Sequence, residues 1–368
     1  MSKIFELFGF PLEKWCVKAQ ENCQQAHCPF MDADCDGGGN RYLSGINLAI
    51  RKDLRKFFPG KKSVQSGVCS LQLNPDEQPW IVCPRRLLSL RQANPHYQSA
   101  TIAKLVSVSN LQRETPYRVW SEVKMKIAQE DEDGESKSFD YAFDYILASV
   151  APKPLSEIAA LIGKTKPQAQ KMAEANGYTL AQRNGDVWVE DFPTDPITIV
   201  EVMTSSTSGG NKAKRTQIAM AFEDAVKHGN HHNGPGINYR QVWARMVSQL
   251  IVKSQVGMAW GGKTIWVLQD LLADYISKST ALDLAKYVSN HPDEVNILAF
   301  GYGKKMLPSK HNGNPIELTD CSFYAGPVSE AGKETSGFID IVKIASIPPK
   351  QHLWFSLFNK KPSIILRT

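Results

Sequence analysis

Residues 197–203 read ITIVEVM, an apolar and β-branched run that holds a single carboxylate, Glu201. Pro193 and Pro196 precede the run, and the small polar residues of 205–210 follow it. This composition and these borders predict a buried strand. A carboxylate in a buried strand is costly unless a partner or a cation neutralises it, so the presence of Glu201 needs a chemical explanation.

A second apolar run, YAFDYIL (141–147), also holds a central carboxylate, Asp144. Two acids on adjacent strands supply the oxygen ligands that Mg²⁺ prefers, and this cation keeps several waters and bridges to substrate phosphate. A bound cation would also neutralise the buried acids. The pair therefore predicts metal-assisted hydrolysis of a phosphodiester. The structural alternative is that Arg or Lys partners satisfy both carboxylates.

Length and composition set broad limits on the class of protein. A chain of 368 residues predicts two or three units around a sizeable core. The net charge of +6 and the pI of about 8.8 permit a nucleic-acid partner without requiring one. No run approaches the roughly 20 apolar residues of a membrane span, and the start lacks a secretory signal. We expect a cytoplasmic protein with no membrane partner.

Cysteines are concentrated at the start of the chain. Six of the seven fall within the first 83 residues, namely Cys16, Cys23, Cys28, Cys35, Cys69 and Cys83. Disulfides are rare inside cells, so metal ligation is the better explanation. The spacing of Cys16 and Cys23 equals that of Cys28 and Cys35, so spacing alone leaves the ligand set open. A tetrahedral thiolate site suits zinc or iron.

The segment 154–180 predicts two helices joined at Gly163-Lys164-Thr165, and Asn184-Gly185 predicts a hairpin just beyond them. Two helices, a tight turn and a hairpin are the outline of a winged helix-turn-helix that reads DNA. An ordinary helical hairpin is the alternative. Exposed side chains of the second helix would contact phosphates (Lys164, Lys166 and Lys171) and base edges (Gln168 and Gln170).

The remaining elements are predicted from periodicity. Strands are expected at 117–128 and 295–303, short strands or knuckles around Cys69 and Cys83 at 67–73 and 79–88, and helices at 44–57, 212–227 and 238–259. The run HHN (231–233) is interpreted as part of an exposed loop.

Taken in order, several motifs resemble the NotI type of restriction endonuclease. They are HCPF (27–30), Cys35, GVCSL (67–71), WIVCPRRLL (80–88), YAFDYILASV (141–150), ITIVEVM (197–203), RQVWARMVSQLIVKSQVGMA (240–259) and KTIWVLQDLL (263–272). The resemblance is patchy and covers the greater part of the chain. Its most specific part is the set of four cysteines with their flanking residues.

The resemblance implies a PD-(D/E)XK nuclease core, an α/β fold with a mixed central sheet flanked by helices. It implies a structural four-cysteine metal site, which holds iron in that family, at Cys28, Cys35, Cys69 and Cys83. Asp144 and Glu201 match the catalytic acids that bind Mg²⁺. Asp140 is the local rival of Asp144, and the F-D-aromatic context favours Asp144. Glu122 is a candidate third acid.

Two departures from the family pattern stand out. Met203 takes the position, two after the glutamate, that is normally Lys and is Gln in NotI itself, and methionine can neither donate a hydrogen bond nor carry charge. Lys124 and Lys126, on the neighbouring strand, are the candidates to replace it; the alternatives are that the metal does most of the work or that the protein is inactive. In addition, 57 positions separate Asp144 from Glu201 (201 − 144), which indicates that the winged segment is inserted between the catalytic strands.

These inferences predict three regions. They are a metal-binding region at 1–100, a nuclease core at 101–150 and 192–368, and an inserted DNA-reading module at 151–191. Arg85, Arg86 and Arg91, beside the cysteines, could add DNA contacts. The expected function is a Mg²⁺-dependent type II restriction endonuclease, a homodimer on a short palindromic site in double-stranded DNA. A methylation-dependent endonuclease and a non-catalytic DNA-binding regulator with a structural metal are the alternatives.

Overall fold

The ITIVEVM run lies at the centre of a mixed sheet in the computed structural model. It forms the end of strand β12 (Asp186–Met203), which pairs with β10 (Ser136–Pro154) on one side and β15 (Lys263–Gln269) on the other. The sheet continues through β16 (Val295–Gly301) to β17 (Asp320–Gly326) at one edge, and β9 (Tyr117–Glu130) forms the other edge. Only the β12–β15 and β15–β16 pairs are parallel. The structure describes residues 2–15, 17–38, 45–91, 97–109, 111, 117–130, 136–183, 185–208, 210–303, 313–329, 337–343, 345, 349–351 and 357.

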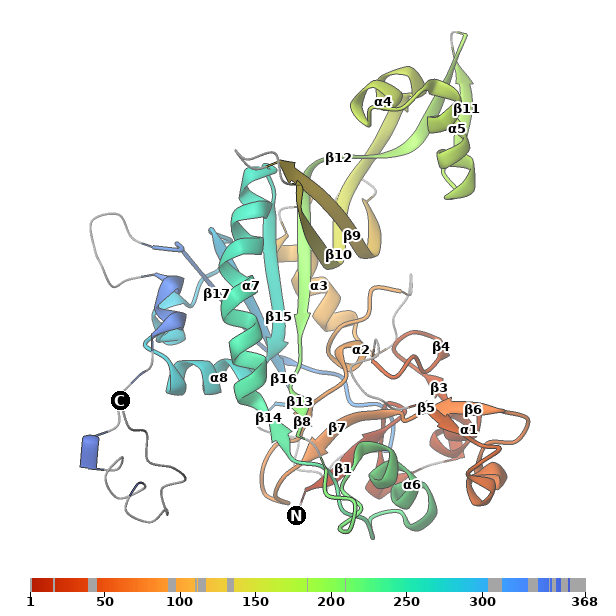
Figure 1. Cartoon of the computed structure of the whole chain (residues 1–368), viewed down its shortest axis with the longest axis vertical. Coiled ribbons are helices and arrows are strands. Elements are labelled where there is room, and N and C mark those ends of the chain that lie inside the picture. Colours follow the sequence, from red (N-terminus) through yellow and green to blue (C-terminus); the bar gives the residue numbers. More distant parts are fainter. Residues whose placement is uncertain are drawn as a thin grey trace, which may run out of the picture.

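Helices cover both faces of this sheet, as the predicted fold class requires. Helix α7 (Tyr239–Ala259) runs along one face with α8 (Asp270–Ser279), and it packs Val242, Met246 and Leu250 against Trp266 and Leu268 (Figure 1). On the other face, α2 (Pro84–Leu87) and α3 (Ser99–Val108) pack against Val200, Val202, Ile265 and Val267. Successive strand residues therefore point to opposite apolar layers, as β geometry demands. The protein is a mixed α/β fold.

The first ninety residues form a smaller structure beside this sheet. Strands β1 (Lys3–Leu7), β2 (Phe10–Pro11), β7 (Val68–Gln72) and β8 (Trp80–Ile81) make a four-stranded sheet in the order β2-β1-β7-β8. Helix α6 (Ile218–His228) supplies Ala221, Phe222, Ala225 and Val226 to the same core. The N-terminal region thus shares its core with a helix that the predicted division placed in the nuclease unit. Shorter elements complete it, namely α1 (Val17–Gln25), β3 (His27–Cys28), β4 (Ala33–Asp34), β5 (Gly45–Asn47), β6 (Ser63–Gln65), β13 (Ser206–Thr207) and β14 (Ile237–Asn238).

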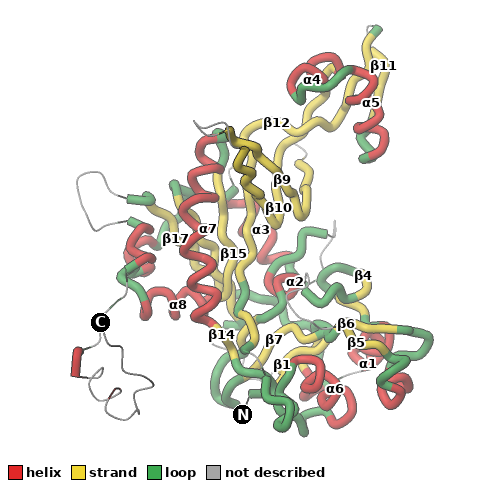
Figure 2. The backbone as a smooth tube through the Cα atoms, in the orientation of Figure 1, coloured by secondary structure: helices red, strands yellow, loops and turns green. Residues whose placement is uncertain are grey.

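The inserted module has the predicted outline. Helices α4 (Leu155–Leu161) and α5 (Lys166–Ala175) are followed by β11 (Leu180–Arg183), which forms a hairpin with the start of β12. Gly163 ends α4 with a φ of +63°, a conformation that glycine adopts without steric cost. Thr165 and Gln168 form a capping box at the start of α5. Figure 2 shows the module at the far end of β10 and β12, carried by these two strands.

Two local predictions are wrong. The expected helix at 44–57 is instead β5, a turn and a short 3₁₀ helix (Lys52–Phe57), because Asn47 closes the turn through a hydrogen bond from the Ala49 amide to its side chain. The 231–233 loop is not simply exposed. His232 is buried; its Nε2 accepts from the Ile4 amide at 2.8 Å, and its Nδ1 lies 2.8 Å from the Gly229 carbonyl.

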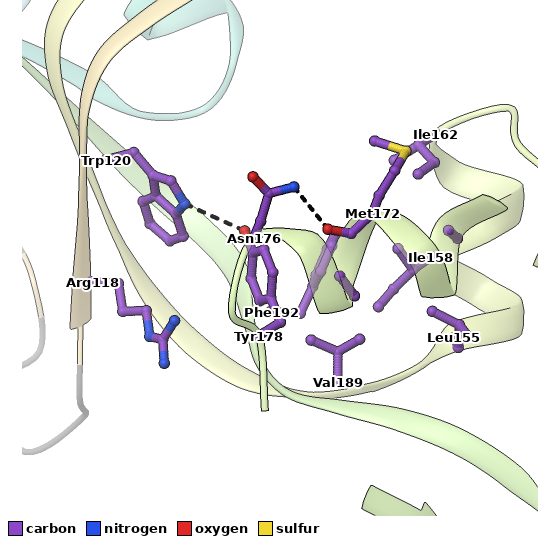
Figure 3. A pocket seen from close by; sticks show the side chains of 12 residues that line it. Arg118, Trp120, Leu155, Ile158, Ile162, Met172, Asn176, Tyr178, Val189 and Phe192 are labelled. Carbon is purple, nitrogen blue, oxygen red and sulfur yellow. Dashed lines mark hydrogen bonds between the residues drawn. The ribbon is translucent and has the colours of Figure 1, made fainter. Parts of the chain in front are cut away.

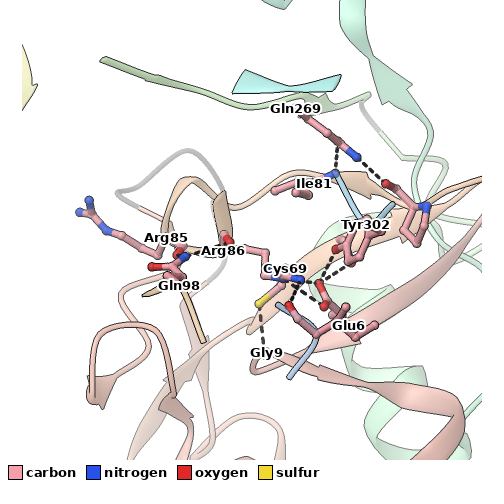
Figure 4. A network of polar contacts seen from close by, with 12 residues as sticks. Glu6, Gly9, Cys69, Ile81, Arg85, Arg86, Gln98, Gln269 and Tyr302 are labelled. Carbon is pink, nitrogen blue, oxygen red and sulfur yellow. Dashed lines mark hydrogen bonds and ion pairs between the residues drawn. The ribbon is translucent and has the colours of Figure 1, made fainter. Parts of the chain in front are cut away.

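A buried ion pair fastens the N-terminal strand to the rest of the molecule (Figure 4). Arg86 and Glu6 are both fully buried, and the Arg86 Nε lies 2.8 Å from a Glu6 oxygen. Ser70 and Tyr302 donate to the same carboxylate, while Arg86 Nη2 donates to the Ile316 carbonyl. The prediction that Arg86 contacts DNA is therefore wrong, because its guanidinium is enclosed in this network.

We expect Arg86→Met to lower the free energy of unfolding by about 3–5 kcal/mol, because Glu6 would be left as a buried charge without its partner. Urea denaturation followed by circular dichroism measures this loss. Arg183→Met is the matched control: Arg183 pairs with Glu190 at the surface, where such pairs contribute about 0–1 kcal/mol. Equal losses in the two variants would contradict the assignment.

Candidate active site

The sheet divides where the two predicted acids lie. Strands β10 and β12 pair up to Tyr145 and Val200, after which β12 continues alongside β15 and β10 alongside β9. Asp144 is the first β10 residue beyond this pairing, and Glu201 is its counterpart on β12. The Val202 amide donates to Asp144 Oδ2 at 2.8 Å. The Asp144 side chain therefore accepts this hydrogen bond at the point where backbone pairing between β10 and β12 ends. The structure thus brings together the two acids, although they are 57 positions apart in sequence.

Glu201 points to the side of the sheet that α7 covers. It is only 4% exposed, and its Oε2 lies 2.6 Å from the Nζ of Lys253 on α7. The same Nζ donates to the Ala142 carbonyl at 2.7 Å and lies 5.5 Å from the centre of the Phe143 ring. Lys253 therefore provides the Lys partner that the structural alternative required. It also provides a cationic donor beside the two carboxylates.

Burial, and after it the nearby Asp144, raise the pKa of Glu201, while Lys253 lowers it, and the net result is a pKa of about 7. Within the part of the chain that the structure describes, Glu201 Oε1 is buried and has no hydrogen-bond partner. A buried carboxylate oxygen that lacks a hydrogen-bond partner and lies beside a second carboxylate destabilises the folded state. A divalent cation held by Asp144 and Glu201 would remove this cost, so the donor set fits Mg²⁺.

The position of Met203 follows from its place on β12. Met203 faces the same side as Glu201 and packs against the apolar residues between the sheet and α7. A cationic side chain reaches Glu201 from α7, since Lys253 Nζ lies 2.6 Å from Glu201 Oε2. Helix and strand approach closely at this point: a Cβ added to Gly257 would lie 2.6 Å from Thr264 Oγ1. This close contact allows a lysine side chain to reach Glu201 from the helix.

A cleft of about 310 Å³ opens in front of Asp144. Asp144, Glu122, Lys124 and Arg85 all line it. The strand register places Glu122 across from Asp144, because the flanking residues pair as Phe143 with Val123 and Tyr145 with Ser121. The candidate acids Asp144 and Glu122 and the candidate lysine Lys124 thus lie together in the cleft. Lys124 is not the residue paired with Glu201, and the side chain of Lys126 lies outside the described ones.

Two arginines hold Glu122. Arg85 Nη2 and Arg91 Nη2 lie 2.8 Å and 3.0 Å from its Oε1, and Arg85 Nε also contacts Asp36 at 3.0 Å. Glu122 has a φ of +55°, an uncommon conformation for a residue with a side chain. Arg85 lines the cleft, and its contact with DNA stays a prediction. Asp140 stands in the same Phe-Asp-Tyr context as Asp144, so that context does not distinguish the two acids. Position does: Asp140 is exposed farther along β10, and Asp144 lines the cleft.

The four cysteines named by the resemblance gather in one cluster. Cys28, Cys69 and Cys83 are buried together, Cys35 packs against them, and Cys23 belongs to a different apolar cluster. Cys16 lies outside the described residues. Burial, and after it the charge of Cys83, raise the pKa of the Cys28 thiol to about 12.

Backbone amides surround the sulfur atoms of this cluster. Gly9 donates to Cys69 Sγ at 3.3 Å, and amides two or three residues downstream are directed at the sulfurs of Cys28, Cys35 and Cys83. Amide donors of this kind stabilise thiolates, and four thiols with such donors form a chemically suitable set for iron or zinc. Nevertheless, in the described ranges no group of three or more His, Cys, Asp or Glu side chains lies at metal-binding spacing. The thiolate metal therefore stays a prediction.

Most of the predicted DNA contacts in the module are engaged within the protein. Lys166 forms an ion pair with Asp186, Gln168 caps α5, and Gln170 donates to Glu174 at 2.9 Å. Lys164 and Lys171 are exposed. Of the five side chains, these two have no polar contact among the residues that the structure describes.

Comparison with known protein families, with curated protein sequences and with solved structures gave no match. Among the described residues, no helix has both the length and the apolar character needed to cross a bilayer.

Sequence reasoning missed Lys253. The signal was present, since Lys253 follows Met246 and Leu250 at helical spacing and is thus a charge on the buried face of an amphipathic helix. A buried lysine on a helix implies that an acidic side chain lies within reach. That acid is Glu201 on β12, whose burial the sequence had left unexplained.

The raised pKa of Glu201 predicts a pH dependence of stability. The folded-state pKa of about 7 lies above the ordinary value of 4.5, so the stabilising contribution is complete below pH 4.5 and is lost as the pH rises through 7. In metal-free protein we expect the free energy of unfolding to fall by about 2–3 kcal/mol more between pH 5 and pH 8 in the parent than in Glu201→Gln. Urea titrations at both pH values measure the difference. Parallel pH profiles would show that Glu201 ionises normally.

Proposed function

We propose that the protein is a Mg²⁺-dependent endonuclease with a PD-(D/E)XK core, acting on double-stranded DNA as a type II restriction enzyme. The observation that carries the proposal is the meeting of Asp144, Glu201 and Lys253 at the division of the sheet. Two acids on diverging strands with a lysine beside them form the catalytic set that the sequence motif lacked. The resemblance to NotI-type enzymes supplies the substrate class.

The residues have separate tasks in this proposal. Asp144 and Glu201 would hold Mg²⁺, which when bound supplies charge stabilisation and activation of water. Lys253 donates to the carboxylate and favours its ionised form, because a positive charge at 2.6 Å partly offsets the rise in pKa that burial causes. Its ammonium is also the donor available to the phosphate oxygens as negative charge develops on them. The Phe143 ring limits access of water on this side of the ammonium.

The cleft and the module supply the DNA contacts of the proposal. Arg85 and Lys124 line the cleft and would approach the phosphates beside the reacting one. Lys164 and Lys171 of the module would contact phosphates farther along the duplex. A homodimer would match a palindromic site with its own two-fold symmetry.

A non-catalytic DNA-binding regulator is the second candidate, and one observation favours it. The Glu201–Lys253 pair already compensates the buried charge in part, so the acids are not obliged to bind a metal. A cleavage assay separates the two functions.

We expect the parent protein to cleave methylated or unmethylated genomic DNA in the presence of Mg²⁺. Sequencing of the fragment ends gives the site, and the comparison between the two DNA samples separates a conventional enzyme from a methylation-dependent one. Lys253→Met should lower the cleavage rate about 10²–10³-fold, because the donor to the developing charge is removed. Glu201→Gln should remove cleavage.

The controls for this assay are Lys124→Ala and Gln255→Ala. Gln255 is an exposed residue of α7, two positions after Lys253, and its replacement should leave the rate unchanged. A large loss of cleavage rate in Lys124→Ala, with no loss in Lys253→Met, would show that Lys124 on β9 is the cationic donor to the phosphate. No cleavage by the parent on any genome would favour the regulator.

We further propose that Cys28, Cys35, Cys69 and Cys83 hold one structural iron or zinc ion. We expect about one equivalent per chain in elemental analysis, with visible absorbance only for iron, and a lower melting temperature after chelation. Cys83→Ser should lose the metal, whereas Cys23→Ala should keep it. Parent protein without metal, and with a melting temperature equal to that of Cys83→Ser, would rule the site out.

A further inference from the structure

A second cavity, of about 360 Å³, lies where the inserted module meets the edge strand β9 (Figure 3). Small-molecule sites are about 300–1,000 Å³, so the cavity is large enough for a ligand of that class. Three aromatic side chains, Trp120, Tyr178 and Phe192, line it together with the apolar face of α4 and α5. The site is separate from the Asp144 cleft, and the functions proposed above do not use it.

The aromatic side of the cavity is held in place by polar contacts. Trp120 Nε1 donates to the Tyr178 hydroxyl at 3.3 Å, and the Arg118 guanidinium lies 5.9 Å from the centre of the Tyr178 ring. Arg118 is itself paired with Asp191. Because the Tyr178 oxygen accepts from the indole, its own hydrogen is directed elsewhere and can be donated to a ligand.

A second polar group stands beside the rings. The Asn176 side-chain amide donates to the Met172 carbonyl at 2.7 Å, which fixes the amide and directs its oxygen away from the helix (Figure 3). The cavity therefore offers flat rings for stacking, one acceptor and one donor. Proteins recognise an unstacked nucleobase by this combination, with the rings on its face and the polar groups on its edge.

Strand β9 connects this cavity to the cleft. Arg118 and Trp120 line the cavity, and Glu122 and Lys124, the next two alternate residues of the strand, line the cleft. Two residues of extended strand span about 6.6–6.8 Å. Successive nucleotides of a duplex advance about 3.4 Å along the axis, so a group in the cavity is a near neighbour of a phosphate in the cleft.

We propose that the cavity receives one nucleobase turned out of the DNA duplex, close to the phosphate that lies over Asp144. The proposal rests on the proposed action on DNA and adds a means of recognition. It explains why Lys166, Gln168 and Gln170 are engaged within the protein, since the module reads a base through its cavity rather than through these side chains. Met172, which is 48% exposed at the mouth, adds an apolar contact.

The test uses the full-length Glu201→Gln protein, so that DNA is bound without being cut. Two 25-base-pair duplexes are compared by fluorescence anisotropy. One contains 2-aminopurine opposite an abasic site, and the other contains it paired with thymine. An unpaired base leaves the stack at the lowest cost. We expect about tenfold tighter binding of the unpaired duplex, because stacking on the aromatic rings is gained without the loss of a base pair. The emission of 2-aminopurine should change on binding.

Tyr178→Ala should reduce the ratio of the affinities for the unpaired and the paired duplex to near one. Since this replacement could disturb the module, Met172→Glu provides a second test: the site is exposed, and a carboxylate at the mouth repels DNA. Tyr178→Phe should keep most of the preference through its ring. Gln182→Ala, on the exposed hairpin, is the matched control and should keep all of it.

Equal affinity of Glu201→Gln for the two duplexes, together with cleavage of DNA by the parent protein in Mg²⁺, overturns this proposal alone. If Glu201→Gln binds neither duplex and the parent protein cleaves nothing, the proposed function is overturned as well. If the ratio is one and Met172→Glu converts a dimer to a monomer in sedimentation, the cavity is an interface between two copies and receives no base.

Discussion

The structure depends on one buried carboxylate that has to be compensated at the point where the central sheet divides. Glu201 lies there with 4% of its surface exposed, and the Lys253 ammonium contacts only one of its oxygens. A buried pair of this kind contributes little net stability, because desolvation offsets the attraction between the charges. Its presence between two well-packed apolar layers is better explained by function than by folding. The chain retains a costly group where a cation can be bound.

The same division of the sheet explains why the neighbouring residues lie where they do. Once β10 leaves β12, its outer partner β9 must follow it, and the side chains of β9 then face the opening. Arg85 reaches this opening from the cysteine-rich region, where it joins Asp36 and Glu122. The N-terminal region is therefore physically connected to the cleft. Arg85, two residues after Cys83, makes this connection through its contact with Glu122.

Sequence patterns predicted the parts of the fold that depend on neighbouring residues. The apolar runs around Asp144 and Glu201 gave the central strands, and the glycines and turn residues gave the inserted helices and hairpin. Contacts between segments that are far apart in the sequence could not be predicted from it. Arg86 stood in a motif suggestive of DNA contact, yet its partner Glu6 lies 80 positions away. Lys253 lies 52 positions from Glu201. The 44–57 segment had a helical pattern that pairing between β5 and β6 overrode.

The way in which the module is attached has a consequence for how such proteins diversify. It enters and leaves through β10 and β12, which stay paired from Tyr145 and Val200 to Pro154 and Trp188. The junction is thus a two-stranded ribbon, and a ribbon accepts any insert whose ends emerge as neighbouring antiparallel strands. Under the proposed function, DNA-reading modules of different kinds could be exchanged at this point by recombination without altering the strands that carry Asp144 and Glu201. Catalysis and recognition would then evolve at independent rates within one chain.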